Sequence, residues 1–524
     1  MNALIIDLTH GGVKIAIELS KLSYFKEIFS YDIYKTLKNN EKKLLKTNNI
    51  HLIEDISLFE NEIKEKNINI NDFIIISPVH CPLTAEKFRN RLKPRNNASK
   101  KENYQIKVEN RIIEQEIKNN LNHHEAVRLI LSKWKLEAEK NHIPIIEVTG
   151  VKGKTSSVAM LKEILIDFNP LVLSSLGATL YNNGESIELK ENISITPASI
   201  LETIELAEKI SMQKINDSAK IPEFNFHDKF HFNYNSCIFE SSLGVTGIGN
   251  IGILTNIVEN YPIANNTSNA KEAKEQIFNC DLIIAEMETL ENFYEKRAID
   301  KKNRINTFTL SQKAELKNDS NLIVDKILYG MDKTELNISF KNIKTIHGNN
   351  IKGSLKFETN ALGKHHVLNI LGVVTAALTL EIDAKIIQEK LNKFKGIKGR
   401  SSQKTTNGIR IIEEINPGIN VKAIESSINM IKDLDEYYII IGGKYGITCE
   451  EINEKDLATL LNYFIIEKKI NLVLVDELGL GIKNKMNTSV LHIDDPIEAQ
   501  KIAIENKKNI LFIYRSNYSQ LNKR

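Results

Sequence analysis

Short apolar runs alternate with amphipathic stretches at both ends of the chain. Near the start, apolar runs at residues 3–6, 28–31 and 73–76 each end in polar residues, and residues 13–22 have the spacing of an amphipathic helix. From residue 408 onward, strand-like runs again alternate with helical stretches, at residues 410–413, 437–441, 472–475 and 510–514. Strands that alternate with helices favour parallel sheets. The pattern therefore predicts an α/β protein with a parallel sheet at each end.

The middle of the chain carries the most specific motif, Thr-Gly-Val-Lys-Gly-Lys-Thr at residues 149–155. A β-rich run precedes it at residues 143–148, and a helical pattern with one apolar face follows it. Glycines let backbone N–H groups close around phosphate oxygens, and a helix N-terminus adds a partial positive charge. Lys154 is then placed to reach the outer phosphates, and the Thr155 hydroxyl to bind Mg²⁺. The motif predicts nucleotide binding by Thr149, Gly150, Val151, Lys152, Gly153, Lys154, Thr155 and Ser156.

This motif is shorter than the usual phosphate-binding loop, which has a further glycine where Val148 stands. A Gly-Lys turn that only caps a helix is the structural alternative, but the preceding strand and the following helix favour nucleotide binding. A second candidate ligand is Glu240, which lies in the apolar run 236–243 and would face the loop from a strand end. Mg²⁺ prefers hard oxygen ligands together with phosphate. We therefore expect Glu240 to bind Mg²⁺ rather than to be a surface residue.

Composition argues against several classes of protein. The 70 Lys and Arg residues nearly balance the 67 Asp and Glu residues, giving a formal charge of +3, so nothing indicates a nucleic-acid partner. The four cysteines have no Cys-x-x-Cys spacing, which argues against a disulfide framework or a zinc site. No basic region precedes the first apolar run, and no run reaches the ~18 residues of a membrane span. We expect a cytoplasmic protein of about three domains, at roughly 150 residues per domain.

Polar residues at the ends of the first strands form a second candidate site. In parallel sheets, ligands bind at the carboxyl ends of the strands. Thr9, His10, Gly11, Gly12, Asp32, His80 and Cys81 would gather there. The Gly-Gly turn lacks the full Gly-x-Gly-x-x-Gly pattern, so a tight turn without a ligand is as well supported as a substrate site. His80 next to Cys81 suggests a metal, yet without further ligand spacing a loop is favoured, and the pair His123-His124 reads as a helix N-terminus.

The order of the central motifs resembles the Mur ligase family of ATP-dependent ligases. Residues 149–155 are similar to its phosphate loop, and Phe-Glu-Ser-Ser at 239–242 to the strand whose Glu holds Mg²⁺. Residues 273–278 match the segment whose lysine is often carbamylated to hold a second metal, here Lys274. Residues 362–369 and 396–400 resemble segments that approach the nucleotide, which gives Asn369 and Arg400. One departure concerns the second metal site, because the family has Asp-His where Asn260-Tyr261 stands.

This resemblance implies three domains, ATP and Mg²⁺. The expected division is a Rossmann-like substrate-binding domain at residues 1–115, a central P-loop ATP-binding domain at 116–397 and a C-terminal α/β domain at 398–524. The resemblance also assigns roles. The catalytic residues would be Lys154, Glu240, Lys274 and Arg400; the nucleotide would also contact Asn369 and Arg400; and metal would be held by Thr155, Glu240 and Lys274.

Four further segments, at residues 7–16, 76–83, 123–129 and 195–202, resemble a Mur-like branch of methanogenic archaea that acts on a nickel tetrapyrrole acid. ATP would then activate a propionate carboxylate, and a ring carbon would attack it to close a carbocyclic ring. His10, Gly11, Gly12, His80 and Cys81 would line the tetrapyrrole site. Tyr261 and His365 are the candidates for the base that generates the carbon nucleophile.

Three alternatives remain at this point. An amide-forming ligase that extends a pseudomurein peptide would share every ATP-site residue. It would also need an amino-acid acceptor, and the sequence of the last domain contains no recognisable motif for an amino-acid pocket. A P-loop GTPase switch is disfavoured because no Asn-Lys-x-Asp motif occurs. A non-catalytic carrier of a metallocofactor is disfavoured because Lys154, Thr155, Glu240 and Arg400 occur together. The sequence gives no oligomeric state.

Overall fold

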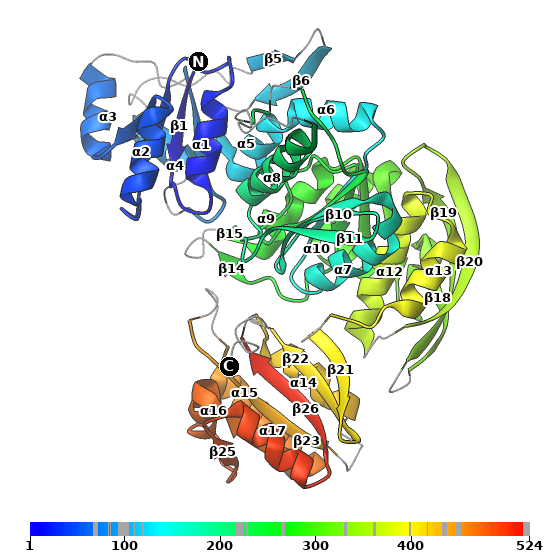
Figure 1. Ribbon diagram of the computed structural model, residues 1–524. Coiled ribbons are helices and arrows are strands. Elements are labelled where there is room, and N and C mark those ends of the chain that lie inside the picture. Colours follow the sequence, from blue (N-terminus) through cyan, green and yellow to red (C-terminus); the bar gives the residue numbers. More distant parts are fainter. Residues whose placement is uncertain are drawn as a thin grey trace. The chain divides into compact units, whose positions relative to one another are not determined.

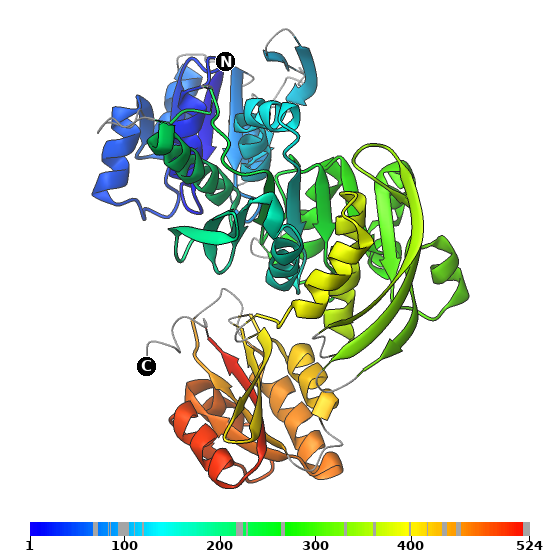
Figure 2. The same ribbon diagram turned by 45° about the vertical axis from the view of Figure 1, so that its right-hand side comes forward.

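The structure is a computed structural model. It describes the chain except for residues 66–71, 82, 84, 93–103, 109–110, 118–119, 216–223, 227–228, 264–267, 330–332, 360–362, 398–399, 417, 432–436, 447–451 and 517–524. Its elements, shown in Figures 1 and 2, form two compact units. The first comprises Met1–Asp325, Ile338–Leu355 and Leu368–Lys390, and the second comprises Lys326–Asn337, Lys356–Val367 and Leu391–Arg524.

The first unit begins with a parallel sheet in the order β3-β2-β1-β4-β7. Its strands are β1 (Asn2–Ile6), β2 (Ile28–Tyr31), β3 (Ile50–Ile53), β4 (Phe73–Ser77) and β7 (Asn120–Asn122). Along β1, Ala3 and Ile5 pack on one face with α1 (Gly12–Ser20), while Leu4 and Ile6 pack on the other with α3 (Ile56–Glu65). Burial on both faces explains the continuous apolar runs. The three strands predicted for this region are confirmed, and β3 and β7 are additional.

The large sheet of the chain has the order β11-β10-β9-β12-β8-β13-β16-β17-β18-β19-β20. Strand β8 pairs in parallel with β12 on one side and β13 on the other, so the segment after β8 leaves the middle of the sheet. The strands are β8 (Ile145–Thr149), β9 (Pro170–Ser174), β10 (Gly177–Asn182), β11 (Glu185–Lys190), β12 (Ser236–Glu240), β13 (Ile251–Leu254), β16 (Leu282–Glu286), β17 (Ile305–Thr309), β18 (Leu322–Leu328), β19 (Thr334–Lys344) and β20 (Asn350–Thr359).

Helices and short strands complete this part of the chain (Figure 1). The helices are α2 (Asn39–Thr47), α4 (Ala85–Leu92), α5 (His123–Ile130), α6 (Ser132–Lys140), α7 (Lys154–Ile164), η2 (Ile166–Phe168), α8 (Pro197–Ile215), α9 (Ala270–Lys274), η3 (Glu275–Asn279), α10 (Met287–Asp300), η4 (Lys302–Arg304), α11 (Ala314–Asp319), α12 (Lys364–Thr379) and α13 (Ala384–Lys393). Two hairpins pair β5 (Tyr104–Val108) with β6 (Arg111–Ile117) and β14 (Pro262–Ile263) with β15 (Ser268–Asn269).

The stretch 217–235 has no helix or strand in its described part. It nevertheless packs into the core through Phe224, Phe226 and Tyr234, which are buried. The Tyr234 hydroxyl donates to Glu208 on α8 at 2.9 Å and accepts from the Trp134 indole at 3.2 Å. Burial raises the pKa of Glu208. Residues 217–223 and 227–228 lie outside the described residues.

The second unit contains a sheet in the order β21-β22-β26-β23-β24-β25, parallel from β22 onward. The strands are β21 (Arg400–Thr406), β22 (Ile409–Ile415), β23 (Tyr437–Gly443), β24 (Asn471–Val475), β25 (Leu491–Ile493) and β26 (Asn509–Arg515). Two apolar cores, one on each face, bury it against α14 (Val421–Ile431), α15 (Glu454–Lys468), α16 (Asp476–Lys483) and α17 (Pro496–Glu505). The predicted alternation of strands and helices after residue 408 is confirmed.

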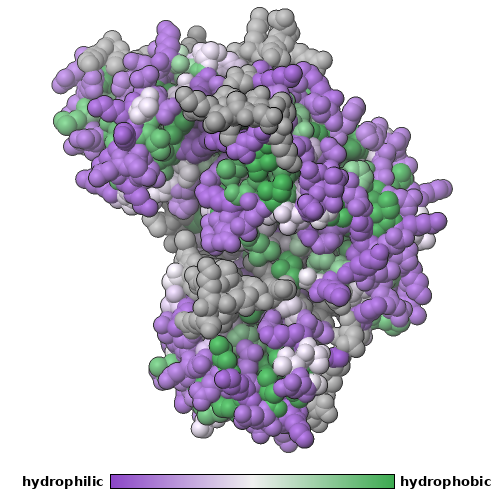
Figure 3. Space-filling model, viewed as in Figure 1, coloured by the Kyte–Doolittle hydropathy of each residue, from purple (hydrophilic) through white to green (hydrophobic). Residues whose placement is uncertain are grey.

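Apolar side chains on the surface are scattered. The face in Figure 3 is mostly hydrophilic, with small separate hydrophobic areas. Well-exposed apolar residues, such as Leu58, Ile299 and Ile466, come from distant segments. Within the described part of the chain, no helix combines the length and apolar character needed to cross a membrane.

Candidate active site

The predicted phosphate loop connects β8 to α7 and requires glycine at two positions. Gly150 (φ 145°) and Gly153 (φ 82°) have positive φ, which favours glycine. A Cβ on Gly150 would lie 1.9 Å from Thr255 Oγ1, and one on Gly153 would lie 2.0 Å from Asn369 Oδ1. The predicted nucleotide residue Asn369 therefore lies against the loop. Backbone N–H groups of this segment precede a helix N-terminus, which is a favourable place for phosphate.

The segment after β13 holds the loop from the side. Val151 N donates to Asn256 O at 3.0 Å, and Lys152 N donates to Asn256 Oδ1 at 3.0 Å. In return, Asn256 Nδ2 and Thr255 Oγ1 donate to Lys152 O at 3.1 and 2.5 Å. This clamp sets the loop conformation. The sequence did not indicate this clamp, because it joins residues that lie more than 100 positions apart.

Oxygen donors gather where α7 begins. Thr155 Oγ1 donates to Glu240 Oε1 at 2.8 Å, and it lies 2.9 Å from Ser175 Oγ. Ser175 N donates to Glu240 Oε2 at 3.0 Å. Thr155 and Glu240 are 2 % and 1 % exposed, so Glu240 is not a surface carboxylate. Two hydroxyls and one carboxylate are hard ligands of the kind that Mg²⁺ takes, so these residues fit Mg²⁺. Ser175 was missed, although it directly follows an apolar strand.

The cation of Lys154 lies over the same loop, since its Nζ donates to Gly150 O at 3.0 Å and Val151 O at 3.4 Å. Lys274, the candidate for carbamylation, is fully buried in α9, and its Nζ lies 5.5 Å from the centre of the Tyr261 ring. Tyr261 thus occupies the neighbourhood of Lys274 at the position where the Mur family has a histidine. Ser156 lies in the first turn of α7.

Only some of the residues predicted for the N-terminal site lie close together. His10 and His80 meet, with Nδ1 of His10 3.0 Å from Nε2 of His80. Cys81 points away, because its buried thiol donates to Leu83 O at 3.2 Å, and burial raises its pKa to about 11. Asp32 accepts hydrogen bonds from the backbone of its own loop, from Tyr34 and Leu37.

Gly11 and Gly12, next to His10, lie where a larger side chain would clash with neighbouring atoms. Gly11 (φ 88°) caps α1, and a Cβ there would lie 2.2 Å from the Cβ of Ala198. A Cβ on Gly12 would lie 2.7 Å from the backbone oxygen of Asp7. The paired histidines begin α5 as predicted, with Asn122 as the cap. Both His123 and His124 are buried, and burial lowers the pKa of each to about 3, so both rings are neutral.

A cleft of about 460 Å³ lies beside the turn that carries His80. It is lined from β7, α5, η3 and α10, with Val79 at one side and with Arg128, Glu272 and Arg297 among its charged residues. The three cationic side chains of the lining, Arg128, Arg297 and Lys301, are matched by three carboxylates, Glu125, Glu272 and Glu275, and Arg297 pairs with Glu275.

Comparisons with known proteins find similarity along nearly the whole chain. Residues 403–517 match the family model "Coenzyme F430 synthetase CfbE, C-terminal domain". The coenzyme F(430) synthetase of Methanocaldococcus jannaschii is 28% identical over 496 residues, covering 92% of this chain and 93% of the relative. That of Methanosarcina acetivorans is 27% identical over 485 residues, covering 88% and 87%. Among solved structures, MurF from Acinetobacter baumannii has a TM-score of 0.53 at 15% identity, covering 78% of this chain and 82% of that one. The chain has a Mur ligase-like fold and is similar in sequence to coenzyme F(430) synthetases.

The Mur ligase-like α/β fold predicted from the order of the motifs is thus confirmed. Within it, the phosphate-loop residues, Glu240 and Asn369 lie together in the first unit. Arg400 begins β21 in the second unit, and its side chain lies outside the described part. His366 is half-buried at the start of α12, and burial lowers its pKa well below the usual range.

Proposed function

We propose that this protein is an ATP-dependent ligase, specifically a coenzyme F(430) synthetase. The observation that carries the proposal is the match to two such synthetases over about nine tenths of each chain. The phosphate loop and the Thr155–Glu240 pair support ATP as the second substrate. We also propose the division into domains at residues 1–115, 116–397 and 398–524.

The proposed ATP site consists of the phosphate loop and a few polar or charged side chains. Backbone N–H groups of residues 150–155 would surround the phosphates, Lys154 would neutralise their charge, and Asn369 and Arg400 would position the nucleotide. Thr155 and Glu240 would hold Mg²⁺, with a carbamylated Lys274 at a second position, and the ion would neutralise charge on the transferred phosphoryl group. Charge neutralisation and positioning supply most of the catalysis in such reactions.

The proposed reaction joins a carboxylate to a carbon atom of the same molecule. A propionate oxygen of the seco-F(430) acid attacks the γ-phosphorus of ATP, which gives an acyl phosphate and ADP. A ring carbon that has lost a proton then attacks the acyl carbon, which forms the carbon–carbon bond and releases phosphate. Tyr261 and His365 are the candidates to take the proton. Exclusion of water protects the acyl phosphate from hydrolysis.

The substrate of this reaction is a nickel tetrapyrrole, and we place it near the N-terminal site. His10, Gly11, Gly12, His80 and Cys81 were predicted to line it. Of these, His10 is exposed and His80 is half-buried, while Cys81 faces the core. The adjoining cleft supplies Arg128 for a substrate carboxylate. We place the reaction in the cytoplasm, which fits the free thiols of Cys81, Cys237 and Cys280.

An ATP-to-ADP assay with Mg²⁺ and the seco nickel tetrapyrrole acid, without any amine, tests this function. We expect ADP release coupled to the change in absorbance on ring closure. ADP release that requires an amino acid and a peptide precursor would instead establish the alternative, an amide ligase that extends a pseudomurein peptide. Omitting the tetrapyrrole is the control, because it separates substrate-dependent turnover from background hydrolysis.

A further inference from the structure

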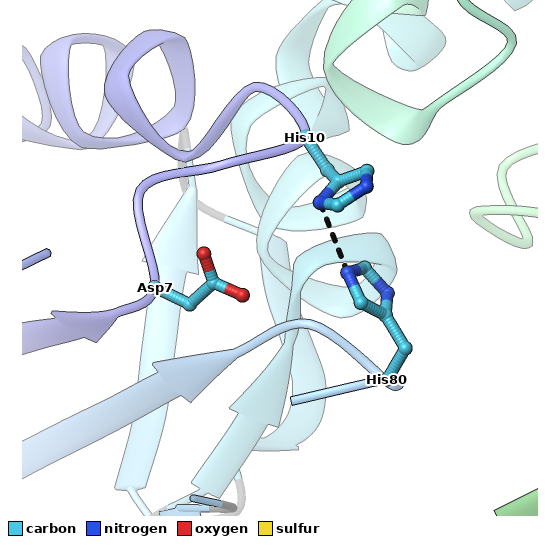
Figure 4. A group of neighbouring side chains, drawn as sticks. All are labelled: Asp7, His10 and His80. Atoms are coloured by element: carbon cyan, nitrogen blue, oxygen red, sulfur yellow. Dashed lines mark hydrogen bonds between the residues drawn. The ribbon is translucent and has the colours of Figure 1, made fainter. Parts of the chain in front are cut away.

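Three potential metal ligands converge at the carboxyl edge of the N-terminal sheet (Figure 4). Asp7 directly follows β1, His10 lies in the turn before α1, and His80 follows β4. One carboxylate oxygen and one nitrogen from each imidazole all lie within 4.8 Å of one another. The two nitrogens are 3.0 Å apart. Because metal–nitrogen bonds in proteins are about 2.0–2.1 Å, both nitrogens can reach the same ion.

The Asp7 carboxylate gives an independent indication. This side chain is 0 % exposed, and its Oδ1 accepts hydrogen bonds from the backbone and the hydroxyl of Thr9 at 2.9 and 2.5 Å. Its buried Oδ2 has no hydrogen-bond partner among the described residues. Figure 4 shows the carboxylate beside the two imidazole rings. Buried carboxylate oxygens normally have partners, and a cation between the three side chains would be such a partner.

We propose that Asp7, His10 and His80 bind a divalent transition-metal ion. Two imidazoles and one carboxylate suit Zn²⁺, Ni²⁺ or Co²⁺, whereas Mg²⁺ prefers sites made of oxygen alone. His10 is exposed, so an ion can enter from solvent. Three protein ligands leave further coordination positions open to water or to a carboxylate of a ligand.

The number of converging ligands favours a free ion over the nickel of a tetrapyrrole. A macrocycle already supplies four nitrogens around its metal, which leaves at most one position for the protein on each face. Three side chains that meet at one point therefore fit an ion that no macrocycle surrounds. The inference does not depend on the proposed substrate.

Titration of the full-length, chelator-treated protein with Co²⁺ alone tests the site, because Co²⁺ held by imidazoles absorbs visible light. We expect one equivalent to bind with the visible absorbance of an imidazole-bound ion, and Zn²⁺ to displace it. His10→Gln and His80→Gln should each weaken binding by at least about tenfold, since even changes beside metal ligands cost 10- to 100-fold. His51→Gln is the matched control, because His51 is an exposed histidine on β3 of the same sheet.

Thermal unfolding distinguishes a variant that has lost metal binding from one that has lost its fold. Zn²⁺ should raise the unfolding temperature of the wild type and of His51→Gln, but not of the other two variants. Absence of Co²⁺ binding by the wild type, or binding that survives both substitutions, would overturn the proposal. The proposal would also be overturned if the His10 and His80 substitutions changed the spectrum of the bound nickel tetrapyrrole but left Co²⁺ binding unchanged. Failure of the ring-closure assay would leave the Co²⁺ result untouched, so the two proposals fail separately.

Discussion

At the residue scale, Lys154 is the cation that the proposed mechanism depends on most. It lies at the N-terminus of α7, and its ammonium group contacts the loop carbonyls of Gly150 and Val151. Replacing Lys154 with Ala removes the charge that would offset the transferred phosphoryl group. We expect ADP formation to fall by on the order of 10³-fold or more. Lys162→Ala, two turns further along the same helix, is the control and should retain activity in the same ADP assay. Wild-type turnover by Lys154→Ala would refute the assignment.

Residue roles that follow from a local motif could be predicted, and those that follow from long-range contact could not. Lys154 and Thr155 are recognisable because the strand, the glycines and the helix are contiguous in the sequence. Ser175 reaches Glu240, 65 residues away, only because β9 and β12 are neighbours in the sheet. Asp7 and His80 meet for the same reason, since β1 pairs with β4. Neither pairing is visible as a spacing in the sequence.

At the scale of elements, strand β8 does more than lead into the phosphate loop. Its Glu147 is fully buried, and its carboxylate accepts hydrogen bonds from Thr246 N and Oγ1 at 2.8 and 2.7 Å. Gly247 N and Gly249 N donate to the other oxygen at 2.9 and 3.0 Å. One carboxylate thereby fixes the loop between β12 and β13, the strands on either side of β8.

Glu147→Gln should therefore destabilise the central sheet. A glutamine would turn an NH₂ group toward backbone N–H donors, which leaves buried donors unpaired at a cost of about 2–4 kcal/mol. We expect a clearly lower unfolding temperature by calorimetry. Glu188→Gln on the exposed edge strand β11 should change stability by no more than about 0.5 kcal/mol. Equal unfolding temperatures for the two variants would show that the Glu147 bonds contribute little.

Most helices and strands could be predicted from the sequence, but the order of the strands in the sheets could not. Apolar runs with periods of two or 3.6 residues are local, so β1, β2, β4 and four strands of the C-terminal sheet, β22, β23, β24 and β26, could be predicted, whereas β21 and β25 were missed. The short strands β3 and β7 bury few side chains and leave a weak pattern. Strand order depends on which runs pair, so the placement of β8 between β12 and β13 required the structure.

At the scale of the whole molecule, the C-terminal sheet carries its own core on both faces. Ile412, Ile428 and Leu511 belong to one buried cluster, and Ile411 and Phe512 belong to the other. A sheet that is covered on both faces by helices from its own segment has its own core and can form an independent domain. The match of residues 403–517 to a domain model agrees with this reading.

A fragment of residues 400–516 should thus fold alone, as the proposed boundary at residue 398 requires. We expect a cooperative urea transition by circular dichroism, with a stability of about 5–15 kcal/mol. A shorter fragment of residues 421–516 is the matched control. It lacks β21 and β22, so one edge of β26 loses its partner and the core residues Ile411 and Ile415 are removed. That fragment should show no cooperative transition. If the longer fragment also lacks one, the sheet depends on other parts of the chain, and the boundary at residue 398 does not separate a domain.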